Sequence, residues 1–286
     1  MRTVYLYSAL VALGLFTRCS PDKSRMLGND IRLFQGGDAW ALAKAVSQND
    51  TAAITRCVQQ EHIPVDTREP RFGQTLLMWA VKTNHYQAAK TLLRNGADPN
   101  VADTYNRTSA FMSAATYGPD YDRSPALLNL LLAYGGDPNA VEQGTKPDEP
   151  QYKPRNTPLL YAAGCCLEKT KRLVEAGANV NFKNENQRTA LLAALHGGKE
   201  GPQVVHYLLL ECKADFKNSF VVTYDTHDTI CFAQLLRQWV YPLNSPEHKT
   251  KMEIVHYLQV HGQNYWETPV PEEIKRHYAA EYVARY

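Results

Sequence analysis

Short apolar stretches recur along most of the chain, with leucine and alanine at three-residue spacing. Leu77 and Ala80 show this spacing, and Leu159 and Ala162 repeat it further along. Such spacing places apolar side chains on one side of a helix, where they can be buried together. A second, leucine-rich stretch follows each of the first ones after a few polar residues. The pattern therefore predicts pairs of short helices, each with one buried stripe.

The apolar stretches belong to a block that repeats at a fixed period. Thr75 and Thr108 are 33 residues apart, and Thr157 and Thr189 are 32 residues apart. Each block closes with a glycine or a substitute for it and an Asp/Asn-rich segment, as in the Gly-Ala-Asp-Pro-Asn run that begins at Gly96. Threonine is a favoured helix N-cap, and glycine accepts the positive φ that often ends a helix. The period predicts stacked helix–turn–helix units that fold together.

These blocks resemble the ankyrin repeat, which starts with Thr-Pro-Leu-x-x-Ala and ends with Leu-Leu-x-x-Gly-Ala-Asp-x-Asn. The resemblance is strong for four units over residues 71–217. A degenerate first unit precedes them at residues 43–66, and a weaker sixth follows at residues 229–262. The resemblance implies an all-α solenoid of about six helix–turn–helix units over residues 37–268. It also implies a protein-binding role.

Departures from the repeat mark what is individual to this chain. Insertions occur at residues 118–125 and 142–155, and Lys213 replaces the helix-ending glycine of the fifth unit. A polar stretch over residues 217–228 precedes the sixth unit. Insertions in repeat proteins map to loops, often on the binding face.

The last residues, 269–286, predict one helix that caps the stack. Pro271 followed by two glutamates is a typical helix start. Four apolar or aromatic side chains then recur at four-residue spacing: Ile274, Tyr278, Tyr282 and Tyr286. We expect this stripe to cover the open core of the last unit, with partner binding as the alternative.

The first residues differ from the repeats. Arg2 precedes an apolar run at residues 4–16, which has the length of a signal-peptide core and is too short to span a bilayer comfortably. The alternative is a buried helix of the main domain. We predict a signal peptide at residues 1–19 and a linker at residues 20–36.

Cys19 and its neighbours resemble the lipobox of bacterial lipoproteins, in which an apolar residue lies three positions before a lipidated cysteine. Phe16 takes that apolar position, but Arg18 stands where the family has a small residue. The resemblance implies lipidation of Cys19 and, with Ser20 after it, sorting to the outer membrane on the periplasmic side. Ordinary cleavage after Cys19 is the alternative.

Composition narrows the function further. Lys and Arg total 31 against 29 Asp and Glu, a net charge of +2. A nucleic-acid binder normally has a clear basic excess, so we expect no nucleic-acid partner. The six cysteines leave five without Cys19, so a complete disulfide framework is excluded, although one bridge is possible.

No catalytic, cofactor or metal site is predicted. The glycine-rich residues 197–201 lack the spacing and the Ser/Thr of a phosphate loop, and we interpret them as a turn between helices. Cys165 and Cys166 are adjacent, unlike the spaced pairs of zinc sites. His85 fits a structural role.

Partner contacts in the ankyrin family come from the hairpin tips just before the Thr and from the first helix just after its Ala. Several residues at these positions are Tyr or Arg, which carry much of the energy in protein interfaces. Carried onto this chain, the positions are Phe72, Gln74, Lys82, Tyr105, Arg107, Tyr117, Asn156, Glu185, Asn186, Arg188 and His196.

Export signal, binding scaffold and missing chemistry together suggest two functions. In the first, the chain resembles ankyrin-type immunity lipoproteins and is a monomer that blocks a toxin such as a phospholipase of a type VI secretion system. In the second, it is an envelope scaffold or an accessory protein for a periplasmic enzyme. A secreted effector acting inside a host is a third possibility. All three rest on analogy with the family, because no single residue selects among them.

Overall fold

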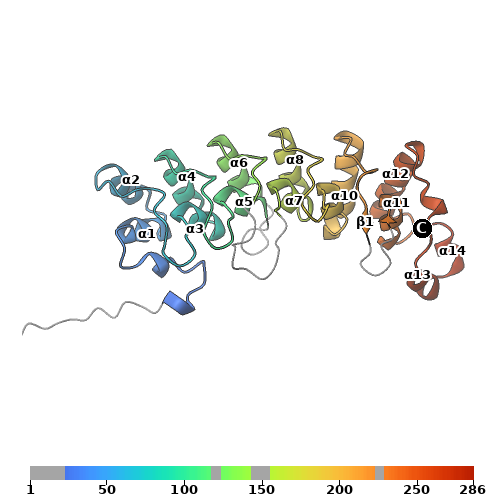
Figure 1. The fold of residues 1–286 in the computed structure, drawn as a ribbon, viewed down its shortest axis with the longest axis horizontal. Coiled ribbons are helices and arrows are strands. Elements are labelled where there is room, and N and C mark those ends of the chain that lie inside the picture. Colours follow the sequence, from blue (N-terminus) through green and yellow to red (C-terminus); the bar gives the residue numbers. More distant parts are fainter. Residues whose placement is uncertain (1–22, 117–123, 143–154, 223–228) are drawn as a thin grey trace, which may run out of the picture.

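A computed structural model describes residues 23–116, 124–142, 155–222 and 229–286, and these form an elongated stack of helix pairs (Figure 1). The model confirms the predicted ankyrin-type solenoid of helix–turn–helix units. The units are α1 (Trp40–Ser47) with α2 (Thr51–Gln59), α3 (Leu76–Lys82) with α4 (Tyr86–Arg94), α5 (Ala110–Ala115) with α6 (Ala126–Ala133), α7 (Pro158–Ala163) with α8 (Leu167–Glu175), α9 (Ala190–Ala194) with α10 (Gly201–His206), and α11 (Phe232–Leu235) with α12 (Pro246–Val260).

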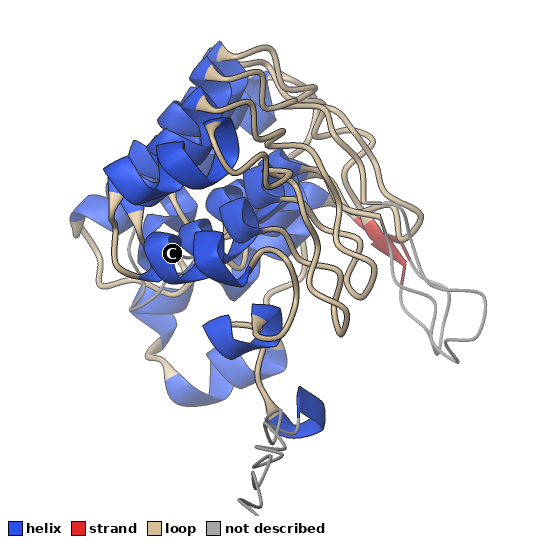
Figure 2. Ribbon diagram, turned by 90° about the vertical axis from the view of Figure 1, so that its left-hand side faces the viewer, coloured by secondary structure: helices blue, strands red, loops and turns tan. Residues whose placement is uncertain are grey.

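The helices form two rows with the hairpin loops along one side (Figure 2). The first helices of units one to five contact one another in order, as α3 contacts α5 and α5 contacts α7. The second helices form the outer row, where α2 contacts α4. One continuous apolar core extends between the rows from Phe34 to Tyr265. The stack is stable as a whole because no unit can bury its apolar stripes alone.

The predicted threonine caps are confirmed in units two, four and five, whereas Ser109 takes the place of the expected Thr108 in unit three. The side-chain oxygen of each N-cap accepts a hydrogen bond from the backbone N–H three residues later, which satisfies one of the amides that a helix start leaves unpaired. The N-caps of the first helices in units two to five are Thr75, Ser109, Thr157 and Thr189.

The outer helices end at a residue of positive φ. Gly96, Gly135 and Gly177 have φ between +87° and +90°. Lys213 takes the same place in the fifth unit with φ +56°, which confirms that it replaces the usual glycine. The helix before Lys213 is also irregular, because α10 continues as a π-helical turn, η5 (Tyr207–Glu211).

Side chains of the Asp/Asn-rich segments join each unit to the next. The amide of Asn100 donates to the carbonyl of Gly135 at 2.9 Å, and its oxygen accepts from the backbone N–H of Asp137 at 2.9 Å. Asn139 makes the same two contacts one unit later, to the Gly177 carbonyl at 2.9 Å and to the N–H two residues beyond it at 2.7 Å. This ladder fixes the spacing between neighbouring hairpins.

The segment predicted as a linker packs on the first two units from residue 23 onward. It contains two short helices, η1 (Lys23–Arg25) and η2 (Ile31–Phe34), and Leu33 and Phe34 are buried. The indole of Trp79 donates to the carbonyl of Asn29 at 2.8 Å. The predicted linker at residues 20–36 is thus packed from residue 23 onward, because its apolar residues cover the open end of the first unit.

The single C-terminal helix predicted for residues 269–286 is also corrected. Two short helices, α13 (Glu272–His277) and α14 (Ala280–Val283), are separated by Tyr278 in an extended conformation. The break turns the chain so that Tyr286 is fully buried and donates its hydroxyl to the carbonyl of Arg237 at 3.1 Å. Tyr282 is half-buried and donates to the Tyr241 carbonyl at 2.7 Å, whereas Tyr278 stays 41% exposed.

Minor elements complete the described part. They are η4 (Gly198–Glu200), η6 (Leu236–Gln238), η7 (Tyr265–Glu267), and an antiparallel pair of strands, β1 (Val221–Val222) and β2 (Thr229–Ile230). Cys57, Cys165 and Cys166 are buried, whereas Cys212 and Cys231 are partly exposed. Among the helices of this part of the chain, none has the length and apolar character needed to cross a membrane.

Three predictions concern positions outside the described residues. They are the signal peptide at residues 1–19 with its lipidation site Cys19, the binding residue Tyr117, and most of the two insertions.

Candidate functional site

One buried polar side chain closes each hairpin tip of units two, three and five. The Glu69 carboxylate accepts from three backbone N–H groups of its tip at 2.7, 2.8 and 3.0 Å. Asp103 accepts two at 2.6 and 2.7 Å, and Asn184 accepts two at 3.0 Å. All three side chains are at most 3% exposed. The tips therefore have a fixed shape before any partner arrives, which lowers the entropy cost of binding.

These tips form a continuous border, which we call the hairpin edge: residues 68–74, 103–108, 155–156 and 184–188. The carbonyl of Phe72 accepts from the N–H groups of Thr104 and Tyr105 at 3.0 and 3.1 Å. The rings of Phe72 and Tyr105 meet edge to face at 5.3 Å, and the guanidinium of Arg71 lies 4.6 Å above the Phe72 ring. Tyr105 is 49% exposed. Two predicted residues thus lie together, with Arg71 as a third that the prediction missed.

A pocket of about 210 Å³ opens between the hairpin edge and the inner helices of units three to five. We call it the central pocket. The amide of Asn156 is 3.3 Å from the hydroxyl of Tyr161, and that hydroxyl donates to the Glu142 carboxylate at 2.5 Å. Its lining is Thr116, Asn156, Leu160, Tyr161, Gly164, Cys165 and Arg188.

Tyr161 stays a hydrogen-bond donor at all physiological pH values. Burial raises the pKa of its phenol well above the ordinary value, and the neighbouring carboxylate of Glu142 adds to this shift. Neither Tyr161 nor Glu142 was among the predicted binding residues. Tyr161 lies on the inner helix α7, directly before Ala162 of the repeat signature. Its polar contact with Glu142 could not be read from the sequence, since Glu142 opens an insertion.

The fifth unit contributes the other end of the site. Arg155 pairs with Glu185, and hydrogen bonds from Arg155 lower the pKa of that carboxyl to about 2. Asn186 and Arg188 are exposed on the same tip. Arg188 also lines the central pocket, so the structure brings it together with the predicted Asn156.

Gln74 and Lys82 turn inward and contact each other. Gln74 is 3% exposed, and its side-chain oxygen accepts from the Lys82 ammonium at 3.2 Å. The N-terminal segment causes this burial, because Gly28 packs directly against the Gln74 amide. Burial also lowers the pKa of Lys82. The prediction that Gln74 offers its side chain to a partner is therefore corrected.

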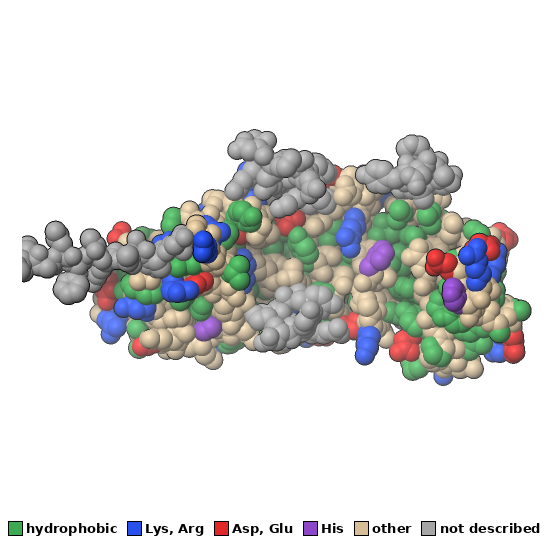
Figure 3. Space-filling model, turned by 90° about the horizontal axis from the view of Figure 1, so that it is seen from below, with side chains coloured by type: hydrophobic (Ala, Val, Ile, Leu, Met, Phe, Trp, Pro, Cys, Tyr) green, Lys and Arg blue, Asp and Glu red, His purple; other side chains and the backbone are tan. Residues whose placement is uncertain are grey.

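His196 and Arg107 are two further predicted contact residues. His196 is exposed beyond the end of α9, and its Nδ1 is 3.4 Å from the Leu192 carbonyl. Arg107 occupies the third tip with φ +57° and is half-buried. Figure 3 shows the molecule from below, with Lys and Arg side chains at both ends and in the middle of the stack.

Metal-ligating and thiol side chains of the described residues bear on the chemistry open to this site. In the described ranges no group of three or more His, Cys, Asp or Glu is arranged to hold a metal ion. Cys165 of the central pocket is buried, with its sulfur 3.9 Å from the Ala115 carbonyl. The glycine-rich residues 197–201 form η4 and the start of α10, which confirms the predicted turn between helices.

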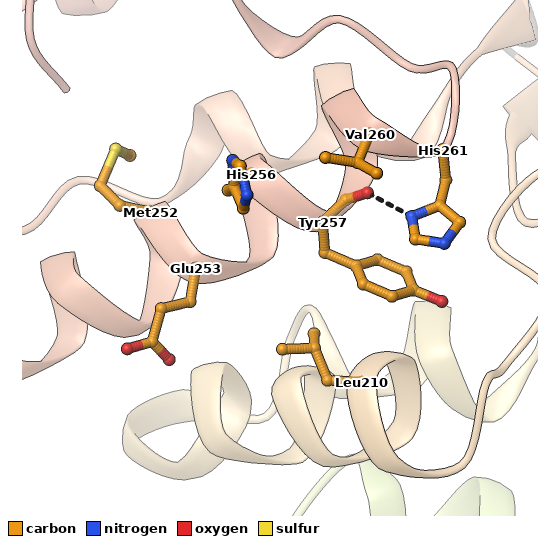
Figure 4. A pocket seen from close by; sticks show the side chains of 7 residues that line it. All are labelled: Leu210, Met252, Glu253, His256, Tyr257, Val260 and His261. Atoms are coloured by element: carbon orange, nitrogen blue, oxygen red, sulfur yellow. Dashed lines mark hydrogen bonds between the residues drawn. The ribbon is translucent and has the colours of Figure 1, made fainter.

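A second hollow lies on the outer row between η5 and α12, with a volume of about 600 Å³ (Figure 4). Its walls are mainly apolar and include Leu210 and Val260. His261 stacks on Tyr257 at 4.1 Å and contacts its carbonyl through Nδ1 at 2.7 Å. None of the predicted binding residues lies in this hollow.

Comparison with protein families agrees with this architecture. A family model described as ankyrin repeats in three copies matches residues 26–103, 42–142 and 111–219. The crystal structure of an ankyrin repeat domain from Acinetobacter baumannii matches with a TM-score of 0.56 and 27% identity, over 77% of this chain and 97% of that one. A second crystallised ankyrin repeat protein matches with a TM-score of 0.51 and 23% identity, over 77% and 96%, which shows the fold alone.

Two characterised proteins are similar in sequence. Protein PhlB of Serratia liquefaciens is 33% identical over 118 residues, which cover 41% of this chain and 48% of PhlB. Human ankyrin repeat and SOCS box protein 6 is 28% identical over 203 residues, which cover 66% of this chain and 43% of that protein. The chain thus spans less than half the length of each of these relatives.

Proposed function

The chain belongs to the ankyrin-repeat family, and we propose that it is a non-catalytic protein that binds its partner through the hairpin edge and the central pocket. Ankyrin repeats mediate binding to other proteins. The proposal rests mainly on the row of hairpin tips closed by Glu69, Asp103 and Asn184. Such preformed tips offer Phe72 and Tyr105 as rigid aromatic contacts.

We further propose that the protein is an immunity protein in the bacterial periplasm, anchored to the outer membrane through Cys19. There it would neutralise a cognate toxin, such as a phospholipase, by covering the toxin's active site. The signal-peptide pattern of residues 1–19 supports export. The similarity to Protein PhlB of Serratia liquefaciens supports a role in bacteria.

Capture of the partner tests this function directly. The mature chain is purified from its own cells, and both the partner and the N-terminus are identified by mass spectrometry. We expect a stoichiometric toxic enzyme and a lipidated Cys19. Recovery of envelope proteins alone, with an unmodified N-terminus, would replace the immunity function by that of an envelope scaffold or accessory protein.

Substitution of Phe72 and Tyr105 tests the surface. We expect the F72A/Y105A variant to lose at least tenfold in affinity for the captured partner, because aromatic anchors carry much of the energy of an interface. A matched control replaces Tyr134, which is exposed on the outer row, by alanine and should bind normally. Equal binding by all three proteins would place the interface elsewhere.

Deletion of the gene tests the biological role. Cells that lack this protein should be poisoned when the toxin gene is intact, and should grow normally when the toxin's active site is inactivated. Growth that is unaffected by the deletion in either background argues against immunity.

A further inference from the structure

The hairpin edge is rich in arginine. It contains five arginines and three acidic residues. Two of the acids, Glu69 and Asp103, are buried and accept backbone N–H groups, and the third, Glu185, is paired with Arg155. The carboxylates of the edge are therefore turned inward or already engaged.

Several of its arginines remain exposed to solvent. Arg68, Arg71 and Arg188 are exposed, and none of them forms an ion pair within the described residues. Arg71 donates to the carbonyls of Lys23 and Met26, each at 2.6 Å, which orients its guanidinium without neutralising the charge. The Phe72 ring beneath it supports the same orientation.

We propose that the hairpin edge binds an acidic segment of a partner protein, with carboxylates received by Arg71 and Arg188. This inference rests on the proposed protein-binding function and specifies the chemistry of the partner. The planar guanidinium can hold a carboxylate through two parallel hydrogen bonds, which gives both affinity and orientation. Arg71 lies on the second tip, whereas Arg188 lies on the fifth tip and lines the central pocket.

The surface between the two arginines favours protein over nucleic acid as the occupant. Phe72, Tyr105 and Asn156 lie between them along the edge, together with Arg107 and with Arg155, whose charge is paired with Glu185, so the positive charges alternate with aromatic, amide and acidic groups. Nucleic acid requires a continuous basic track that replaces phosphate counterions. The net charge of the whole chain is only +2. A partner segment with carboxylates at both ends and an apolar centre would match the two arginines and the aromatic residues between them.

Charge reversal tests the inference. R71E/R188E is compared with R56E/R94E, which makes the same change of charge at exposed arginines of the outer helices α2 and α4. Affinities are measured for the captured partner and for a labelled poly-glutamate peptide at low and moderate salt. We expect R71E/R188E to weaken both interactions at least tenfold and to reduce their salt dependence, while the control stays within about twofold. The milder R71Q/R188Q variant and circular dichroism show that any loss is not due to unfolding.

The outcomes separate this inference from the proposed function. A captured partner whose binding R71E/R188E does not change leaves the function intact and overturns the acidic segment. If no partner is captured, the proposed function is contradicted. Binding of the poly-glutamate peptide then tests by itself whether the hairpin edge receives carboxylates. Absence of poly-glutamate binding, or tighter binding of a DNA duplex than of the peptide, overturns the inference.

Discussion

The middle units and the C-terminal end of this stack are stabilised by different means. In units three and four, each junction uses a copy of the same short interaction, as Asn100 and Asn139 show. At the C-terminal end, the stabilising contacts come from a few large side chains and are not repeated in the other described units. There Arg237 and Lys251 are buried among tyrosines, with the Arg237 guanidinium 3.8 Å from the Tyr265 ring and the Lys251 ammonium 4.3 Å from the Tyr286 ring.

The difference lies in how far the consequence of one substitution extends. A ladder contact joins two neighbouring units and has equivalents at other junctions. When one such contact is removed, the remaining ones still hold the units together, so the loss of stability is small and spread over several units. Arg237 instead donates to the carbonyls of Tyr265 and Tyr286 and has no equivalent in other units. We therefore expect substitutions at the C-terminal end to be local and severe, and those in the middle to be distributed and mild.

Replacement of Arg237 should show the largest effect. R237A removes one donor from each of the carbonyls of Tyr265 and Tyr286 and takes away the centre of the aromatic cluster. We expect a loss of about 3–5 kcal/mol in the free energy of unfolding of the last unit. Hydrogen exchange should accelerate over residues 232–286 and stay unchanged in α3 to α8. Uniform acceleration along the whole chain would contradict the comparison.

Lys251 should make the stability of the same region depend on pH. Burial lowers the pKa of its ammonium to about 7, and the charge of Arg237 adds to the shift. The unfolded chain holds this proton up to about pH 10. Between these values the unfolded state binds more protons, so the free energy of unfolding rises with pH by at most about 1.4 kcal/mol per unit. Below about pH 7 both states are protonated and this contribution is constant.

K251M tests this dependence. Urea denaturation at about pH 7, 8 and 9 should give a rising free energy of unfolding for the natural chain and a flatter profile for the variant. Equal slopes for both proteins would show that Lys251 stays charged in the folded chain.

Asn139 should show the smallest of the three effects. N139A removes the contacts to the carbonyl of Gly177 and to the N–H of Asn179. We expect a loss of about 1–2 kcal/mol, distributed over units three to five. The matched control is N129A, at an exposed position of α6, which should change stability by less than about 0.5 kcal/mol. An effect of N139A confined to one unit would weaken the idea of a shared ladder.

The sequence predicts the middle units well because their signals are local. A capping threonine, a stripe at three-residue spacing and a glycine of positive φ each lie within one helix length, and Thr157 and Gly177 fulfil them. The ends are harder to predict because their contacts join distant residues. Trp79 meets Asn29, and Tyr286 meets Arg237, through interactions that no local pattern announces.

The binding site likewise has residues that the sequence predicts and residues that it does not. Phe72, Tyr105 and Asn156 could be placed on the hairpin edge, since the repeat fixes the position of each tip. The burial of Gln74 could not be foreseen, because it depends on the N-terminal segment folding back. Tyr161 acquires its importance from Glu142, which lies at the start of an insertion.

The repeated register of the ladder also bears on how such a gene can change its length. Asn100 and Asn139 each reach the glycine of the next unit and the second residue after it, so every such junction presents the same atoms. Unequal recombination that removes or duplicates one whole unit would rejoin equivalent surfaces. Leu33 and Phe34 at one end, and Arg237 with Tyr286 at the other, would remain as fixed termini. The length of the hairpin edge can thus evolve in steps of one unit while the two ends of the stack stay the same.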